Sequence, residues 1–226
     1  MGKGLFITGT GTDVGKTYVS ALIVKKLRDA GFRSGYFKAA ASGSQRTQSG
    51  LAPEDAEYVK AVAGIGGKLS EMVPYAYEHA YSPHLAAQIE GNPVEMDVVC
   101  GKYEAMLERY EYVTVEGSGG IVCPIRFDTQ VILLEDVIKK LNLGVLAVAD
   151  SGLGAINRSV LTVSYLRSRE IEVKGIVLNR FRDSIVEMDN RKMIEYLTGV
   201  PVVAALREGE MCLDIGIERL AGFYDE

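Results

Sequence analysis

The stretch Gly9-Thr10-Gly11-Thr12-Asp13-Val14-Gly15-Lys16-Thr17 follows the apolar run Leu5-Phe6-Ile7 after a single residue, Thr8. A strand that leads into a glycine-rich turn ending in Gly-Lys-Thr is typical of a phosphate-binding loop, because backbone N–H groups and the next helix N-terminus attract an anion. In such a P-loop Lys16 reaches the terminal phosphates and the Thr17 hydroxyl ligates Mg²⁺. The usual loop has four residues between its first Gly and the Gly-Lys pair, whereas five separate Gly9 from Gly15. The stretch therefore predicts a strand, a slightly irregular P-loop and a helix that bind a nucleoside triphosphate.

Apolar runs of strand length alternate with helical patterns along most of the chain. We expect strands at 5–8, 34–38, 112–116, 144–150, 173–179 and 200–204, and helices at 17–30, 54–62, 94–109, 133–141, 155–169 and 186–197. The strands are nearly continuous runs of Val, Ile and Leu, as in sheets covered on both faces. The sequence thus predicts the α/β class: a single-domain P-loop NTPase over residues 1–226, with a mostly parallel central sheet and helices on both faces.

The amino-acid composition indicates which classes of binding partner and which cellular compartment to expect. The 226 residues are 47% hydrophobic and carry a net charge of −5, so no basic field favours nucleic acid. Three widely spaced cysteines indicate a reducing cytoplasm and no disulfide framework, and two histidines exclude a His-rich metal cluster. No apolar run approaches the ~20 residues that a membrane span needs. We expect a cytoplasmic protein with neither a membrane nor a nucleic acid as partner.

Several chemically distinct side chains stand where predicted strands end, and in a parallel sheet these ends meet at one edge. Glu116 ends one strand and precedes Gly117-Ser118-Gly119-Gly120. It is an Mg²⁺ ligand, next to glycines that let the backbone approach a phosphate, or merely an acidic residue that terminates a strand, and the glycine-rich turn favours the first interpretation. Lys38 ends another strand, where a bound anion would offset the cost of burying its charge. A surface lysine that reaches solvent is the alternative for Lys38. Asn179 ends the fifth predicted strand, and Leu206-Arg207 follow the last one.

Three further segments allow both a structural and a functional interpretation. Asp55 opens a predicted helix, where it stabilises the N-terminus or, if its loop folds back, ligates Mg²⁺. Leu153-Gly154-Ala155-Ile156-Asn157 is a plain strand-to-helix turn or a second anion site. Ser82-Pro83-His84 predicts an N-cap with proline at the first helical position, and His84 is interpreted as structural.

Taken together, these motifs resemble the dethiobiotin synthetase family of ATP-dependent enzymes. The resemblance runs in order across most of the chain and includes the five-residue spacing of the P-loop, which is this family's form. It rests on residues 9–17, Lys38 with Ser42-Gly43, Asp55, Ser82-Pro83-His84, residues 115–120, residues 153–157 and Asn179.

The resemblance implies the activity and the substrates. An amine of 7,8-diaminononanoate would capture CO₂ (or bicarbonate) as a carbamate, which would attack the γ-phosphate of ATP with Mg²⁺ as cofactor. The second amine would then close the ring of the carbamic–phosphoric anhydride, releasing dethiobiotin, ADP and phosphate. Positioning and charge neutralisation would carry most of the rate.

The resemblance also implies the site residues. Lys16, Lys38 and Thr12 would be catalytic, and Thr17, Asp55 and Glu116 would hold Mg²⁺. Binding of ATP would involve Asp13, Val14, Gly15, Lys16, Thr17, Tyr18, Asp55, Glu116, Gly117, Ser118, Gly119, Asn179, Arg180, Leu206, Arg207 and Glu208. The diamine would contact Thr12, Lys38, Ser42, Pro83, Gly120, Pro124, Ala155, Ile156 and Asn157. The family implies a homodimer, in which the helix start near 155–157 receives the substrate carboxylate from the partner's site.

The chain departs from the family pattern at four positions. Asp13 replaces a usual Glu, Ala39 a usual Pro, and Ser118 a common Ala. Arg158 replaces a usual His beside the carboxylate site, where its fixed charge can strengthen anion binding. The segment after Glu208 matches poorly, so the adenine contacts are the least constrained part of the prediction.

Other nucleotide-binding classes fit less well. A partition- or MinD-type regulatory ATPase carries a signature lysine four residues before the second P-loop Gly, where this chain has Gly11. A GTPase needs Asn-Lys-x-Asp, but Asn179-Arg180-Phe181-Arg182 lacks the Asp. A cobyrinate-amidating synthase needs an additional glutaminase domain. A non-catalytic nucleotide-binding module does not require Lys38, Ser42 and Asp55 at these spacings.

Overall fold

Six parallel strands form one central sheet in the computed structural model, which describes residues 2–48 and 50–225. Their spatial order is β12-β11-β10-β1-β7-β2, and every neighbouring pair is parallel. The strands are β1 (Lys3–Gly9), β2 (Ser34–Phe37), β7 (Tyr112–Glu116), β10 (Val145–Asp150), β11 (Val173–Asn179) and β12 (Val202–Leu206). The predicted parallel sheet and its six strands are therefore confirmed.

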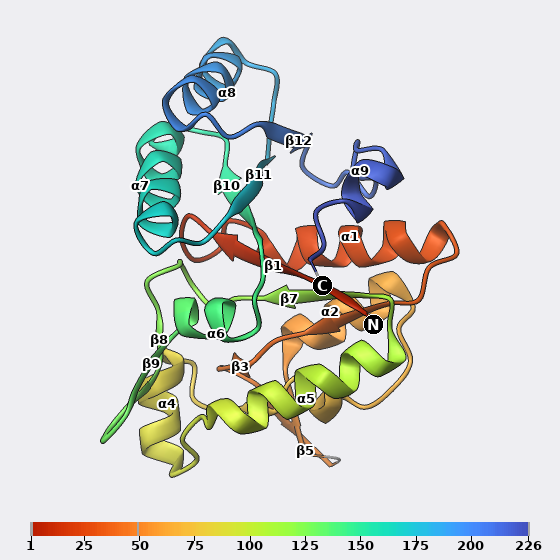
Figure 1. The fold of residues 1–226 in the computed structure, drawn as a ribbon, viewed down its shortest axis with the longest axis vertical. Helices are drawn as coiled ribbons and strands as arrows, with labels where there is room; N and C mark the ends of the chain where they lie inside the picture. Colours follow the sequence, from red (N-terminus) through yellow and green to blue (C-terminus); the bar gives the residue numbers. More distant parts are fainter. Residues whose placement is uncertain (1, 49, 226) are drawn as a thin grey trace.

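The helices connect these strands and cover the sheet. Six correspond to the predicted helices: α1 (Lys16–Asp29), α2 (Glu54–Ala63), α5 (Met96–Arg109), α6 (Leu134–Lys140), α7 (Ala155–Ser168) and α8 (Ile185–Thr198). Three short helices complete the set: α3 (Leu69–Met72), α4 (Pro83–Glu90) and α9 (Ile217–Ala221). In Figure 1, α7 and α8 gather beside β10–β12, whereas α2, α4 and α5 lie at the opposite end of the molecule.

Strand β1 shows why both faces of the sheet are covered. Successive side chains of a strand point to opposite faces. Phe6 joins a core that includes Val99 and Met106 of α5, whereas Leu5 and Ile7 join a second core formed with α1 and α9. All three strand residues are at most 1% exposed. Helices on both faces, as predicted, therefore follow from burial of both sides of β1.

Three small ladders flank the central sheet and were absent from the sequence prediction. They pair β3 (Ala40–Ala41) with β6 (Tyr75–Ala76), β4 (Gln45–Thr47) with β5 (Gly50–Ala52), and β8 (Pro124–Phe127) with β9 (Val131–Leu133). Strands of two to four residues show no period that a sequence pattern could reveal. Each is defined by its partner and not by its own composition.

Most predicted boundaries differ from the observed ones by one or two residues, and two of these differences involve predicted site residues. The last strand spans 202–206 and not 200–204, so Leu206 ends the strand instead of following it. Proline has no N–H for a ladder, and Pro201 precedes the strand, its carbonyl accepting from Ile176. Lys38 lies one residue beyond β2, and its backbone N–H donates to the Met72 carbonyl at 2.9 Å. The predicted helix start at Ser82 is confirmed, since Ser82 is the N-cap of α4 and Pro83 its first residue.

The order of the strands creates a crevice beside β1. From β1 the chain moves to β2 and back to β7 on one side, and then continues to β10, β11 and β12 on the other. Ligands of parallel α/β sheets bind at the carboxyl ends of the strands where the winding direction changes.

The two chain ends lie near each other in Figure 1, and Gly4 pairs with Asp225.

No helix within residues 2–48 and 50–225 has the length and hydropathy needed to cross a membrane. That residues 1–226 form a single domain stays a prediction.

Candidate functional site

The P-loop joins β1 to α1, and a residue from β11 fixes its shape. Gly15 is the N-cap of α1 with a φ of +94°. The side-chain amide of Asn179 donates to the Val14 carbonyl at 3.0 Å. A Cβ atom on Gly15 would lie 2.1 Å from this amide nitrogen. Glycine is therefore required at position 15 for its backbone angle and for the close approach of Asn179.

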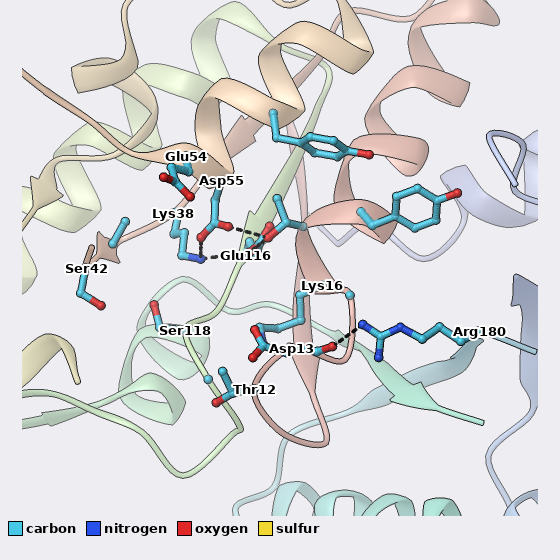
Figure 2. A pocket seen from close by; sticks show the side chains of 16 residues that line it. Thr12, Asp13, Lys16, Lys38, Ser42, Glu54, Asp55, Glu116, Ser118 and Arg180 are labelled. Carbon is cyan, nitrogen blue, oxygen red and sulfur yellow. Dashed lines mark hydrogen bonds and ion pairs between the residues drawn. The ribbon is translucent and has the colours of Figure 1, made fainter. Parts of the chain in front are cut away.

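A pocket of about 770 Å³ opens in front of the P-loop, at the carboxyl ends of β1, β2 and β7. Most of its lining comes from predicted site residues, and Figure 2 shows how they face one another. The lining consists of Thr12, Asp13, Gly15, Lys16, Thr17, Tyr18, Lys38, Ala41, Ser42, Glu54, Asp55, Tyr58, Glu116, Ser118, Gly119 and Arg180. The structure thus brings together Lys16, the predicted metal ligands and three of the predicted substrate residues from separate segments of the chain.

A buried cluster of three charges lies at the centre of this pocket. The Lys38 ammonium donates to Asp55 Oδ2 at 2.5 Å and to Glu116 Oε1 at 2.9 Å (Figure 2). The Glu116 side chain is 0% exposed and that of Lys38 6%. Lys38 is therefore a buried cation, and the alternative of a surface lysine that reaches solvent is wrong.

The cluster keeps its charges through mutual compensation. Burial by itself would lower the pKa of Lys38, but the Glu116 and Asp55 carboxylates raise it above its usual value. Burial would likewise raise the pKa of Asp55, but Lys38 and the Thr17 hydroxyl bring it below its usual value. Lys38 and Asp55 are therefore both charged at neutral pH, where each stabilises the other.

Three oxygen atoms converge beside Lys38 in a way that suits a metal ion. Thr17 Oγ1 lies 2.8 Å from Asp55 Oδ1 and 2.8 Å from Glu116 Oε1. A hydroxyl has one hydrogen and can donate to only one of these carboxylates at a time. Mg²⁺ prefers oxygen ligands and is usually bound through one or two carboxylates. A cation here would compensate the carboxylate that receives no hydrogen bond from Thr17. The residues therefore fit the predicted Mg²⁺ ligand set, and Asp55 both opens α2 and points into the pocket.

Lys16 supplies a second ammonium group to the same pocket. Its Nζ donates to the Gly11 carbonyl of the P-loop at 3.1 Å. Burial lowers the pKa of Lys16 and the neighbouring Lys38 adds to this, although Glu116 and Asp55 act in the opposite direction. Two partly desolvated lysines that lie close together form a strong binding position for a polyanion such as a triphosphate.

The pocket has two chemically different ends. Ser42, Ser118 and Thr12 lie on one side of the lysines in Figure 2, and Arg180 lies on the other. The Arg180 guanidinium donates to the Asp13 carbonyl at 2.8 Å and to Asp150 Oδ2 at 2.8 Å, so it braces the P-loop. On the α1 side, the Tyr18 hydroxyl donates to the Glu210 carbonyl and ties α1 to the loop after β12.

Several predicted nucleotide residues lie outside the pocket lining. Gly117 is in close contact with the sheet core, since a Cβ atom there would lie 3.0 Å from the Phe6 ring. Leu206 is buried, and the Arg207 guanidinium pairs with Asp183. Val14, Asn179 and Glu208 also lie outside the lining. Their contacts with a nucleotide stay predictions.

The predicted diamine residues divide in the same way. Thr12, Lys38 and Ser42 line the pocket, whereas Pro83, Gly120, Pro124, Ala155, Ile156 and Asn157 do not. Gly154, with a φ of +81°, is the N-cap of α7. Arg158 folds back over this turn and donates to the Leu153 carbonyl at 3.2 Å. Its Nε atom is buried and has no hydrogen-bond partner among the described residues.

Three pocket residues and one residue behind the pocket escaped the sequence prediction. Ala41, Glu54 and Tyr58 line the pocket, and Tyr36 lies behind it with its hydroxyl 3.1 Å from Glu116 Oε2. Burial, with Glu116 adding to it, raises the pKa of Tyr36 well above its usual value. Tyr58 could have been found from its spacing, because residues three apart share one face of a helix and Tyr58 follows Asp55 by three.

A family model and two curated relatives show which family the chain is similar to. A family model described as an AAA domain matches residues 3–212. The ATP-dependent dethiobiotin synthetase BioD of Brachyspira hyodysenteriae is 52% identical over 217 residues, which cover 95% of this chain and 96% of that protein. The protein of the same name from Clostridium perfringens is 48% identical, with 88% of each chain covered.

Solved structures with a similar fold are much more distant in sequence. The MinC:MinD cell division complex of Aquifex aeolicus has a TM-score of 0.58 at 14% identity, covering 91% of this chain and 81% of that one. A ParA family ATPase of Chlorobium tepidum also has a TM-score of 0.58 at 14% identity, with coverage of 99% and 90%. These likenesses confirm the predicted P-loop fold and carry no statement about activity.

We expect Gly15→Ala to disrupt the P-loop, and Gly31→Ala is its matched control. Gly31 has a φ of +91°, close to that of Gly15, but a Cβ atom there would meet nothing within 4 Å. The control should lose about 1–2 kcal/mol of unfolding free energy from backbone strain alone. Gly15→Ala should lose more, because it also displaces Asn179, and its affinity for ATP should fall at least roughly tenfold.

Urea unfolding and calorimetric titration with Mg·ATP measure the two effects. Equal losses of stability in both variants, with unchanged ATP affinity in Gly15→Ala, would contradict the role assigned to the Gly15–Asn179 contact.

Proposed function

The chain belongs to the ATP-dependent dethiobiotin synthetase family, and from this premise we propose that it converts 7,8-diaminononanoate, CO₂ and ATP into dethiobiotin, ADP and phosphate. One observation of this structure supports the same activity for this chain. Lys16, Thr17, Lys38, Asp55 and Glu116 all line one pocket directly in front of the P-loop. This set contains the groups needed to bind a triphosphate, hold its metal ion and neutralise a transferred phosphoryl group.

The proposed reaction has three balanced steps. One amine of the substrate attacks CO₂ and loses a proton, which gives a carbamate. A carbamate oxygen attacks the γ-phosphorus of ATP, ADP leaves, and a carbamic–phosphoric anhydride forms. The second amine then attacks the carbonyl carbon of the anhydride, expels phosphate and, after losing a proton, closes the ring. None of these steps needs a covalent bond to the protein.

The protein contributes charge and position to these steps. Lys16, a residue of the P-loop, binds the terminal phosphates of ATP. Lys38 lies between the phosphate position and the end of the pocket that contains Ser42. An ammonium group there can neutralise the carbamate and the phosphoryl oxygens as negative charge develops between them. Preorganised charge of this kind, in a site shielded from water, is the largest contribution to catalysis in many enzymes.

Thr17, Asp55 and Glu116 would hold Mg²⁺ in this proposal. When bound, the ion neutralises phosphate charge and orients the γ-phosphoryl group for in-line attack. Two carboxylates with one hydroxyl leave room for phosphate oxygens and water, as is usual for Mg²⁺ with nucleotides. The support is that Thr17 Oγ1 lies 2.8 Å from one oxygen of Asp55 and 2.8 Å from one oxygen of Glu116.

The two ends of the pocket suggest how the substrates share it. We assign the nucleotide to the end with Tyr18 and Arg180, where Asn179 and the loop at 206–208 would contact the adenine. We assign the diamine to the end with Thr12 and Ser42. Its carboxylate would reach the α7 N-terminus of a partner subunit in a homodimer, beside Arg158. A cytoplasmic location belongs to the same proposal, because that is where the cosubstrates are available.

A regulatory ATPase of the MinD or ParA type is the weaker alternative. The fold likeness to such proteins is at 14% identity, whereas the relatives named dethiobiotin synthetase are 40–52% identical. The position of the signature lysine is occupied by Gly11, whose carbonyl accepts from Lys16 instead.

Phosphate release tests the proposed function directly. We expect ATP, Mg²⁺ and bicarbonate to give phosphate only when 7,8-diaminononanoate is present, with dethiobiotin as the product by mass spectrometry. Lys16→Ala serves as the inactive control, because it removes a phosphate contact. Hydrolysis that is independent of the diamine would instead support a regulatory ATPase.

Replacing Lys38 with Met should slow the chemistry far more than it weakens ATP binding. The substitution keeps the apolar stem of the side chain and removes its charge, so turnover should fall by about 10²–10³-fold. Lys192→Ala removes a charge from the exposed face of α8 and should leave turnover unchanged. Calorimetry and steady-state kinetics separate the effects, and lost ATP affinity with normal turnover would refute the catalytic role.

Arg158→Ala should raise the KM for the diamine and leave the KM for ATP unchanged. The expected increase is about 10–150-fold, since a charged hydrogen bond to a carboxylate contributes ~1.5–3 kcal/mol. Arg167→Ala is the matched control, because Arg167 is an exposed arginine at the far end of the same helix. If the diamine KM does not change in Arg158→Ala, Arg158 lies outside the carboxylate site.

A further inference from the structure

The two oxygens of the Glu116 carboxylate have separate partners. Oε1 faces Thr17 and Lys38, at 2.8 and 2.9 Å. Oε2 accepts a hydrogen bond from the Tyr36 hydroxyl at 3.1 Å. Tyr36 is 0% exposed, so no water competes for this contact. Tyr36 therefore binds Oε2 on the side away from the pocket, and Oε1 faces the pocket.

The sheet register makes this arrangement possible. On the edge strand β2, Tyr36 pairs with Thr114 of β7, and Glu116 lies two residues further along β7. A long aromatic side chain can reach such a diagonal neighbour. Lys38 follows Tyr36 by two residues and contacts the same carboxylate at Oε1. Two residues of one short segment, Tyr36 and Lys38, thus each contact one oxygen of Glu116.

We propose that Tyr36 is a positioning residue, which holds Glu116 so that a single oxygen, Oε1, faces the metal position. The proposal rests on the Mg²⁺ ligand set proposed above. Tyr36 does not touch the substrate or the metal position, because it lies outside the pocket lining. It acts through Glu116 as a neutral donor, since a tyrosine hydroxyl is protonated at neutral pH.

The orientation of the Glu116 carboxylate matters because Mg²⁺ tolerates little variation in its coordination geometry. Mg²⁺ requires near-ideal octahedral geometry, whereas Ca²⁺ accepts a carboxylate through both oxygens in a flexible shell. Without the Tyr36 hydroxyl, Oε2 would be free to turn toward the metal or toward Lys38. Removing such an outer partner of a ligand typically lowers metal affinity by ~10–100-fold.

The test compares Tyr36→Phe with Tyr224→Phe in the full-length protein. Tyr224 is a second buried tyrosine, whose hydroxyl lies 2.6 Å from Thr114 Oγ1 on the same strand β7. Mn²⁺ is the probe, and its dissociation constant in the presence of ADP is measured by electron paramagnetic resonance. Urea unfolding, run in parallel, shows that each variant is folded and how much stability it has lost.

We expect Mn²⁺ to bind about 10–100-fold more weakly to Tyr36→Phe than to the wild type. Tyr224→Phe should bind Mn²⁺ like the wild type, even with a similar loss of stability. Unchanged Mn²⁺ affinity in Tyr36→Phe, or an equal loss in both variants, would overturn the positioning role.

The wild-type measurements separate this inference from the proposed function. Absence of ADP-dependent Mn²⁺ binding in the wild type would overturn the metal ligand set and, with it, the role of Tyr36. Normal Mn²⁺ binding without diamine-dependent phosphate release would instead contradict the proposed reaction, while the Mn²⁺ affinities of the two variants would still decide the positioning role.

Discussion

A fully buried carboxylate, that of Glu116, is the constraint on which the site depends. An ionised carboxylate without a partner in a protein interior is very costly. Here Lys38 is its cationic partner, while the hydroxyls of Thr17 and Tyr36 lie within hydrogen-bond distance of its two oxygens. Lys38 also serves Asp55, so one ammonium compensates two carboxylates. A metal ion bound between these carboxylates would take over part of the compensation and leave the ammonium free to meet an anion.

The parallel sheet is what assembles this cluster. Thr17 follows β1, Lys38 follows β2 and Glu116 ends β7, and these three strands are neighbours with their carboxyl ends at one edge. Burial of both sheet faces fixes the register of the strands and therefore the relative height of these residues. The Asn179 amide, from the more distant β11, then fixes the P-loop by holding the Val14 carbonyl. Stability and site geometry thus depend on the same packing.

The fold alone would not distinguish this chain from regulatory ATPases. MinD and ParA structures share its architecture at 14% identity, because a P-loop on a parallel sheet serves many activities. The difference lies in the residues around the P-loop. Lys38, Ser42 and Asp55 add a buried cation, a hydroxyl and a carboxylate beside the phosphate position. These are the groups that a second, acceptor substrate requires.

The six central strands, the six main helices, the P-loop and the charged residues at the strand ends could be predicted from the amino-acid sequence, because they depend on local periodicity and spacing. Which of these residues contact one another became visible only in the folded chain. Tyr36 and Glu116 are 80 residues apart, and Val14 and Asn179 are 165 apart. The short ladders and the burial of Lys38 likewise depend on partners elsewhere in the chain. A pattern along the chain fixes which face a side chain occupies, but contacts between distant segments depend on strand order and packing.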